Sequence, residues 1–307
     1  MLNKILCIFL LGVLGLTSAA AQTGTAAPKV KGKIIAARVQ GHVIAISKGT
    51  GETRVLHDGD RVTDQTRIVT SPGANIILVF SNGATINIAA DTTLDIEQFE
   101  QDPFGGDLKV SDMKREPGTS LTRLNLAKGE LVGKVVHLNV DKGSEFTVQT
   151  PVGAAGIRGT TFRIIFRPAG HGKARFAVMT SDGVVVFKGL TSEAVAVPAG
   201  TEVEATFDYT FPTSDDQGNS PQAGPVTLET TDLSVTEASE IQVASQQIIE
   251  ALVNLVISPS GTPGTPGAPG TPPPDNNSGT NNNPAQENDA PPPPTNSLPS
   301  TTPGAGL

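Results

Sequence analysis

The stretch NIILVFSNGATINI, residues 75–88, decides the class of fold. Its Asn82-Gly83 dipeptide is a strong signal for a two-residue turn between antiparallel strands. That turn pairs aliphatic residues across the hairpin, namely Val79 with Ile86 and Ile77 with Ile88. A three-residue turn with a bulge would instead shift the register by one residue. Both alternatives predict a β-hairpin.

The first strand of this hairpin is apolar on both faces, because three more large residues alternate with the first set: Ile76, Leu78 and Phe80. Successive side chains of a strand point to opposite faces, so such a strand needs cover on both sides. The pattern predicts a strand in the interior of a β-sandwich or of a β-solenoid-like stack.

A glycine corner recurs along the chain. The unit is a large apolar residue, two others, a glycine, two others and a second apolar residue. It occurs as Leu56/Gly59/Val62, Phe80/Gly83/Ile86, Leu126/Gly129/Val132 and Val197/Gly200/Val203. Glycine adopts positive φ without steric cost, so the flanking residues can lie on two short strands that face one core.

Asp182-Gly183 is a second hairpin signal. Together these patterns predict an all-β fold, a stack of short antiparallel strands (β-sandwich or β-solenoid-like), followed by one helix and a disordered tail. We expect the β-domain over residues 40–212, preceded by a lead-in over residues 22–39.

Residues 1–21 resemble a secretory signal peptide. Lys4 is followed by an apolar run, Ile5–Leu16, that is shorter than the ~20 residues needed to span a bilayer. Small residues follow, and cleavage after Ala21 would leave Gln22 as the first mature residue. The alternative is an uncleaved anchor. We expect export, to the periplasm or to the cell surface.

The sole cysteine, Cys7, lies in that apolar run, so the mature chain would have no disulfide, thiol catalyst or Cys-type zinc site. Loss of Lys4, the only charged residue of 1–21, would change the net charge from −8 to −9. Such an acidic chain does not favour nucleic acid as a partner. No second long apolar segment follows, which predicts no transmembrane helix in the mature chain.

The C-terminal part divides into a linker (213–233), an amphipathic helix (234–257) and a Pro/Gly/Asn/Thr-rich tail (258–307). Ser234 and Glu237 form a capping-box pair at the start of the helix. Its apolar stripe consists of Ile241, Ala244, Ile248, Leu252 and Leu255. The stripe packs either on the β-domain or on a partner. The composition of the tail predicts a disordered, polyproline-like spacer.

The stretch TPVGAAGIRGTTF, residues 150–162, is the one candidate site. Its notable residues are Thr150, Pro151, Gly153, Gly156, Arg158, Gly159, Thr160 and Phe162. A proline ends or edges a strand, and the glycines allow a tight corner. Arg158 would fold over that corner and donate hydrogen bonds to carbonyls or a carboxylate. The alternative is an exposed contact with a ligand.

No other pattern supports catalysis or cofactor binding. The histidines His42, His57, His137 and His171 lack metal-site spacing. Asp58 and Asp60 fit ordinary turn chemistry. The glycines of residues 153–159 match neither a dinucleotide fingerprint nor a P-loop. We therefore expect no catalytic residue, no metal and no cofactor.

TPVGAAGIRGTTFRIIF, from Thr150, resembles the signature of the FecR family's periplasmic domain. The upstream segment VLHDGDRVTDQTRIVTSPGANIILVFSNGATINIAADTTLDI resembles the first half of that domain. LNLAKGELVGKV resembles its middle segment, and VPAGTEVEA resembles its closing strand. The resemblance covers about residues 40–205.

The resemblance implies an all-β periplasmic domain of the kind found in sigma-factor regulators. In those regulators a cytoplasmic segment and a membrane helix precede the domain, whereas this chain has a signal peptide there. We therefore expect a non-enzymatic binding or sensory module at the bacterial envelope, with a protein as partner. The alternative is a structural or glycan-associated surface protein that contacts cell-wall glycan, with the tail as a spacer.

Overall fold

The computed structural model describes residues 28–190, 193–211 and 224–259, and every structural statement below concerns these residues. The predicted signal peptide lies outside them, as does the predicted tail beyond Pro259.

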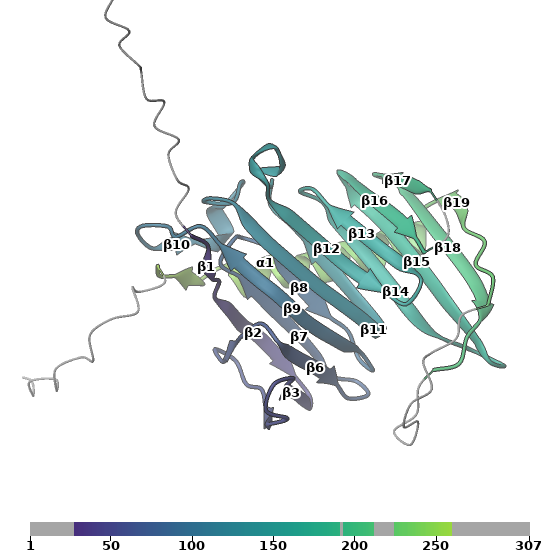
Figure 1. The fold of residues 1–307 in the computed structure, drawn as a ribbon, viewed down its shortest axis with the longest axis horizontal. Coiled ribbons are helices and arrows are strands. Elements are labelled where there is room, and N and C mark those ends of the chain that lie inside the picture. Colours follow the sequence, from purple (N-terminus) through teal and green to yellow (C-terminus); the bar gives the residue numbers. More distant parts are fainter. Residues whose placement is uncertain (1–27, 191–192, 212–223, 260–307) are drawn as a thin grey trace, which may run out of the picture. The chain divides into compact units, whose positions relative to one another are not determined.

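The strands form two large sheets that share β11 (Figure 1). Sheet A contains, in spatial order, β4 (Thr53–Val55), β3 (Val43–Ser47), β6 (Thr66–Thr70), β9 (Thr93–Gln101), β11 (Ser120–Lys134), β12 (Glu145–Thr150), β13 (Gly153–Ile157), β16 (Val184–Gly189) and β17 (Ala194–Pro198), with β1 (Val30–Lys31) beside the end of β9. Sheet B contains β5 (Arg61–Val62), β2 (Ile34–Gln40), β7 (Asn75–Phe80), β8 (Thr85–Ile88), β11, β14 (Thr161–Gly170), β15 (Lys173–Asp182), β18 (Thr201–Asp208) and β19 (Glu229–Asp232).

The remaining elements are small, apart from one α-helix. They are β10 (Leu108–Lys109), which pairs with β20 (Val256–Ile257), the 3-10 helices η1 (Val110–Asp112) and η2 (Val140–Lys142), and the helix α1 (Val235–Leu252). The strand pairs are antiparallel except β11 with β12. The predicted all-β class with one helix is confirmed.

One apolar core lies between the sheets. It takes side chains from both, including Ile68 and Leu124 of sheet A and Phe80 and Phe166 of sheet B, all fully buried. The chain alternates between the sheets hairpin by hairpin, because β12 and β13 are in sheet A, β14 and β15 in sheet B, and β16 and β17 in sheet A again. The hairpins therefore stack as a two-sheet sandwich.

The hairpin of residues 75–88 has the register of the three-residue turn. Leu78 pairs with Ile86, and Val79 with Thr85, so the two-residue turn and its pairing were wrong. Phe80 N donates to Ala84 O at 2.8 Å, and Gly83 has φ of +90°. A glycine with positive φ at the last loop position is typical of a three-residue hairpin.

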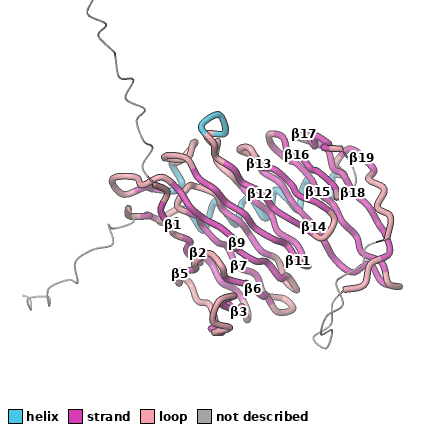
Figure 2. The backbone as a smooth tube through the Cα atoms, viewed as in Figure 1, coloured by secondary structure: helices cyan, strands magenta, loops and turns pink. Residues whose placement is uncertain are grey.

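The strand β7 is buried on both faces, as predicted. Leu78 and Phe80 contribute to the core between the sheets, whereas Ile77 and Val79 contribute to a second cluster under α1. The helix crosses the outer face of sheet B, on the far side in the view of Figures 1 and 2. Sheet B is thus covered by sheet A on one face and by the helix on the other.

Most of the predicted glycine corners connect the two sheets. Gly59 lies between β4 of sheet A and β5 of sheet B, and Gly200 between β17 of sheet A and β18 of sheet B. Asp182-Gly183 joins β15 of sheet B to β16 of sheet A, so the hairpin predicted there was wrong. All three glycines have positive φ, between +80° and +84°.

Gly129 lies inside a strand instead of between two strands. Up to Lys128, β11 pairs with β9 in sheet A, and from Gly129 it pairs with β14 in sheet B. Gly129 has φ of +112° at this transfer point. Leu126 and Val132 therefore lie in different apolar clusters, contrary to the single core predicted for this unit.

The helix begins as predicted and ends earlier. Ser234 caps it, and the reciprocal hydrogen bonds of the capping box with Glu237 are present. Its buried residues Ile241, Ile248 and Leu252 pack on sheet B. Of the two alternatives, the apolar stripe therefore packs on the β-domain and not on a partner. After Leu252 the chain forms β20, because Val256 and Ile257 pair with β10.

Two other boundaries differ from the prediction. The lead-in of residues 22–39 contributes β2, whose Ile34 and Ala36 are buried in the core. The linker of residues 213–233 contributes β19, an edge strand of sheet B. Both segments lack strong alternation of their own, and their pairing depends on distant strands. No helix in the described ranges combines the length and the apolar character needed to cross a bilayer.

Candidate functional site

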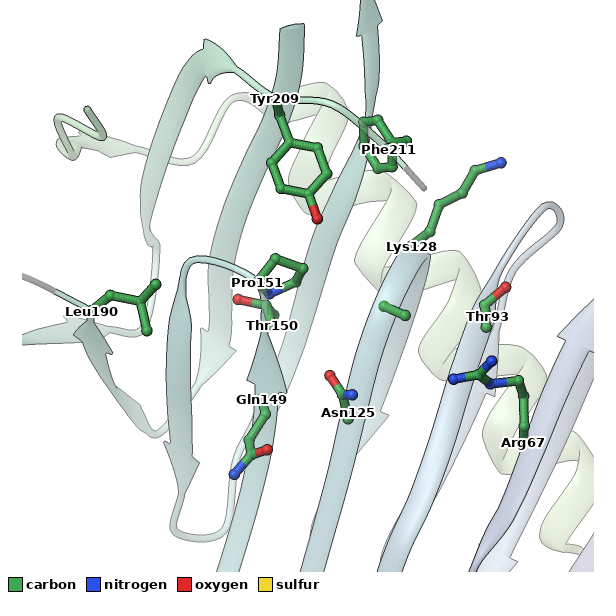
Figure 3. Close-up of a pocket in the computed structure, with 11 residues that line it drawn as sticks. Arg67, Thr93, Asn125, Lys128, Gln149, Thr150, Pro151, Leu190, Tyr209 and Phe211 are labelled. Carbon is green, nitrogen blue, oxygen red and sulfur yellow. The ribbon is translucent and has the colours of Figure 1, made fainter. Parts of the chain in front are cut away.

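A groove of about 730 Å³ lies at the middle of β11, where that strand leaves sheet A, beside the hairpin of β12 and β13 (Figure 3). Residues from several strands line it: Arg67, Thr93, Asn125, Ala127, Lys128, Gln149, Thr150, Pro151, Leu190, Tyr209 and Phe211. The volume is within the range typical of ligand pockets, roughly 300–1,000 Å³.

One part of the groove is apolar. The Tyr209 and Phe211 rings pack edge to face, with centroids 4.6 Å apart. Tyr209 is 4% exposed, and burial raises the pKa of its hydroxyl. Leu190, at the rim, is 75% exposed. A large apolar side chain this exposed, beside a recess with Pro151, suits contact with an apolar group of a ligand.

The other part is polar. Asn125 of β11 and Gln149 of β12 are partners in the parallel register, so their amides lie side by side. Neither amide forms a hydrogen bond with another described residue, and Lys128 forms no ion pair with one. Each amide has a donor and an acceptor to offer.

The groove is locally positive. Arg67 donates to both oxygens of Asp95, from Nε at 2.7 Å and from NH2 at 2.9 Å, and Lys48 donates to the same carboxylate at 3.2 Å. Burial raises the pKa of Asp95, but the hydrogen bonds from Arg67 and Lys48 outweigh burial and lower it. Lys48 lines a separate recess together with Asp64, Glu97 and Glu100, so the groove itself holds the cations of Arg67 and Lys128. The described residues that line the groove include no acid.

The structure separates the residues of the 150–162 stretch. Thr150 and Pro151 line the groove, at the turn of the hairpin that joins β12 to β13. The Thr150 hydroxyl donates to Gly153 O at 2.9 Å and accepts from Val152 N at 3.3 Å. Gly156 lies in β13, opposite Val186.

The rest of the stretch lies away from the groove. Arg158 is exposed and donates no hydrogen bond to a described residue, so the expected brace over the corner is absent. Gly159, with φ of +91°, approaches the backbone of His137 closely. Thr160 is buried, and Phe162 of β14 is buried in the core. The stretch is a hairpin turn and a sheet-to-sheet corner in succession.

Replacement of Gly153 tests the hairpin beside the groove. A Cβ on Gly153 would lie 2.6 Å from Phe187 Cζ and 2.7 Å from Gly189 Cα, at φ of +155°. We expect Gly153→Ala to lower the free energy of unfolding by about 2–4 kcal/mol. Gly156→Ala is the matched control, because its Cβ would meet only Val186 O, at 3.6 Å. It should change stability by no more than ~0.5 kcal/mol. Equal denaturant midpoints for the two variants would contradict this role.

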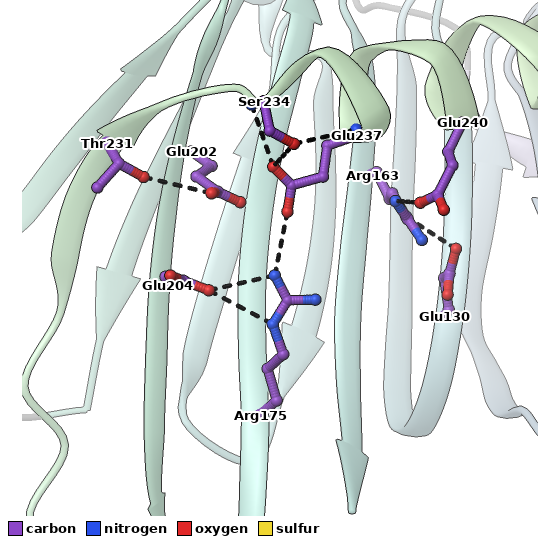
Figure 4. A network of polar contacts seen from close by, with 9 residues as sticks. All are labelled: Glu130, Arg163, Arg175, Glu202, Glu204, Thr231, Ser234, Glu237 and Glu240. Atoms are coloured by element: carbon purple, nitrogen blue, oxygen red, sulfur yellow. Dashed lines mark hydrogen bonds and ion pairs between the residues drawn. The ribbon is translucent and has the colours of Figure 1, made fainter. Parts of the chain in front are cut away.

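A second polar cluster lies between α1 and sheet B (Figure 4). Arg163 Nε donates to Glu130 Oε1 at 2.8 Å, and Arg167 NH2 lies 3.0 Å from Glu130 Oε2. Arg163 also pairs with Glu240 of the helix. Arg163 thus pairs with one carboxylate of the sheet and one of the helix, so the cluster attaches the helix to the sheet, whereas Arg167 Nε has no hydrogen-bond partner among the described residues.

The same cluster continues at the start of the helix. Arg175 NH2 lies 3.2 Å from both Glu204 and Glu237. Beside them, Glu202 is 5% exposed and accepts a hydrogen bond from Thr231 at 3.2 Å, whereas its Oε2 has no partner among the described residues. Burial raises the pKa of Glu202, and the carboxylates of Glu237 and Glu204 raise it further.

The raised pKa of Glu202 predicts the direction in which folding stability changes with pH. The folded state favours the neutral form of Glu202. The contribution of Glu202 to the free energy of unfolding is therefore fully present below the unfolded-state pKa of about 4.3, and it is lost as pH rises through the folded-state pKa. Glu202→Gln stays neutral, so its stability relative to wild type should increase between about pH 4 and pH 7. Urea midpoints at both pH values measure this. A pH-independent difference would show that folding does not raise the pKa of Glu202.

The described residues contain no group of three or more His, Cys, Asp or Glu side chains that could hold a metal ion. The sequence pattern did not identify most of the groove, because its residues come from separate strands. The available signal was the alternation of polar Asn125 and Gln149 with buried Leu124 and Val148, which marks the outer face of sheet A.

Residues 66–189 match the family model described as FecR protein, which confirms the resemblance over a narrower range than the expected 40–205. Two crystal structures of a candidate anti-sigma factor from Parabacteroides distasonis, at 2.50 and 1.65 Å resolution, are similar to this chain. Identity is 13% in each, coverage is 56% of this chain and 62% of that chain, and the TM-scores are 0.36 and 0.37. The chain thus spans less than two thirds of their length. The comparison with curated proteins gave no match.

Proposed function

We propose, from the premise that residues 66–189 form a FecR domain, that this protein is a non-enzymatic binding or sensory module. It acts at the bacterial envelope, in the periplasm or at the cell surface, and its partner is another protein. We propose neither a cofactor nor a nucleic acid as a ligand of this protein.

The groove is the observation that carries this proposal. It combines an exposed apolar rim at Leu190, two amides that form no hydrogen bond with another described residue, and the cation of Lys128. These are contact groups, and the residues that line the groove include neither histidine nor carboxylate as a general base. Exposed apolar side chains next to polar groups are typical of protein-binding surfaces.

Capture from envelope extract tests the proposal. The tagged full-length protein should retain one or more proteins reproducibly, and the same protein unfolded by heating before the capture should retain none of them. In a sedimentation assay with purified cell wall, the protein should remain in the supernatant. Sedimentation with cell wall, together with no captured protein, would contradict the proposal and support a glycan-associated structural role.

A further inference from the structure

We infer that the groove binds an extended segment of the partner protein that carries a carboxylate beside an apolar side chain. This inference rests on the proposed function, and it adds the chemistry of the ligand. Three features of the groove lead to it: its charge, the close packing of its aromatic rings and its pair of amides.

The charge of the groove selects an anionic group. The chain as a whole has a net charge of −8. The described residues that line the groove, in contrast, include the cations of Arg67 and Lys128 and no acid, and although Arg67 is paired with Asp95, Lys128 forms no ion pair with a described residue. A carboxylate of the ligand next to Lys128 would gain an attraction that no lining acid opposes.

The aromatic rings favour an apolar side chain over a sugar. A sugar ring stacks on a broad exposed aromatic face, but Tyr209 is 4% exposed and is enclosed by Phe166 and Phe211, at 5.0 and 4.6 Å between centroids. The accessible apolar surface is that of Leu190, with Pro151 across the recess, and part of the half-buried Phe211, whose ring is tilted against Phe166 and Tyr209 and offers no broad open face. This surface suits an aliphatic or aromatic side chain that inserts between them.

The amides of Asn125 and Gln149 suit a peptide backbone. An amide side chain offers a donor and an acceptor together, as a peptide group does. The two lie side by side below Pro151, and Lys128 lies further along β11, beside Phe211 (Figure 3). An extended segment with its apolar side chain near Leu190 and its carboxylate near Lys128 would pass beside both amides, which could bond its backbone.

Titration with short peptides tests this chemistry. The probe is acetyl-Gly-Asp-Leu-Phe-Asp-Gly-amide, and its matched partner has Lys in place of both Asp residues. In the full-length protein, the acidic peptide should shift the side-chain amide NMR signals of Asn125 and Gln149 and should bind at least about fivefold more tightly than the basic one. Lys128→Glu should abolish or reverse this preference. Lys142→Glu, an exposed substitution outside the groove, should keep it.

Three outcomes would overturn the inference: no shift of these amides, equal affinity for the two peptides in wild type, or shifts caused by N-acetylglucosamine oligomers and not by the peptides. The envelope capture separates this failure from failure of the proposed function. If wild type and Lys128→Glu retain the same protein equally, the binding role stands and the assigned ligand chemistry is wrong.

Discussion

Gly129→Ala should lower the free energy of unfolding by about 3–5 kcal/mol, a large fraction of the roughly 5–15 kcal/mol that holds a domain folded. Two costs add. Gly129 has φ of +112°, which is strained for any residue with a Cβ. The new Cβ would also lie 2.5 Å from the backbone Cα of Thr92, which cannot move away without shifting the chain that leads into β9. Equilibrium denaturation measures the loss.

Gly200→Ala is the matched control, because it measures the cost of a positive φ without a close contact. Gly200 has φ of +83°, but a Cβ there would have no atom within 4 Å. This variant should lose only about 1–2 kcal/mol, the usual cost of left-handed backbone. Equal losses at the two positions would show that the close approach of Gly129 to Thr92 does not matter, and that β11 does not need glycine to pass between the sheets.

Glu130→Ala should also have a large effect, about 2–4 kcal/mol. The side chains of Glu130 and Arg163 are 12% and 10% exposed. Removal of one member of a buried pair leaves the other charge poorly solvated, which costs about 3–5 kcal/mol. Glu240 still pairs with Arg163, which reduces this cost, whereas Arg167 also loses Glu130 as its partner, so we expect a loss of about 2–4 kcal/mol. Thermal or urea unfolding measures it.

Glu250→Ala is the control for this prediction. Glu250 pairs with Arg38 at 3.5 Å, and the two side chains are 55% and 37% exposed. An exposed ion pair contributes about 0–1 kcal/mol, so this variant should remain close to wild type. A comparable loss in both variants would mean that burial does not set the strength of these ion pairs.

Local patterns were sufficient to predict much of the fold. The apolar residues on both faces of 75–80 required two layers of cover, and the structure provides sheet A and α1. Ser234 and Glu237 identified the start of the helix because capping depends on residues close in sequence. These predictions rest on short-range geometry.

The role of each glycine was harder to predict, because positive φ suits a hairpin turn and a corner between sheets equally well. Asn82-Gly83 is a hairpin turn, whereas Asp182-Gly183 is a corner. The difference lies in the distant partners, since β15 pairs with β18 and β16 pairs with β13. The residues next to Gly183 in the sequence do not predict those pairings.

The groove could not be predicted for a related reason. Asn125, Gln149 and Tyr209 come from strands or strand ends that are far apart in sequence, and they converge only after both sheets have formed. Arg158 attracted attention as the one charge among glycines, yet the structure places it in solvent without a hydrogen-bond partner among the described residues. Of the stretch that contains it, only Thr150 and Pro151 reach the groove.

Site-specific photo-crosslinking in cells tests the central claim most directly. A photoreactive residue at Gln149, in the groove, should crosslink the full-length protein to another protein, and an excess of the acidic peptide should suppress that product. The same residue at Gln246, on the exposed side of α1, should not give the product. Crosslinks at Gln149 to cell-wall glycan alone, or the same product from both positions, would contradict the claim that this groove is the protein-binding site.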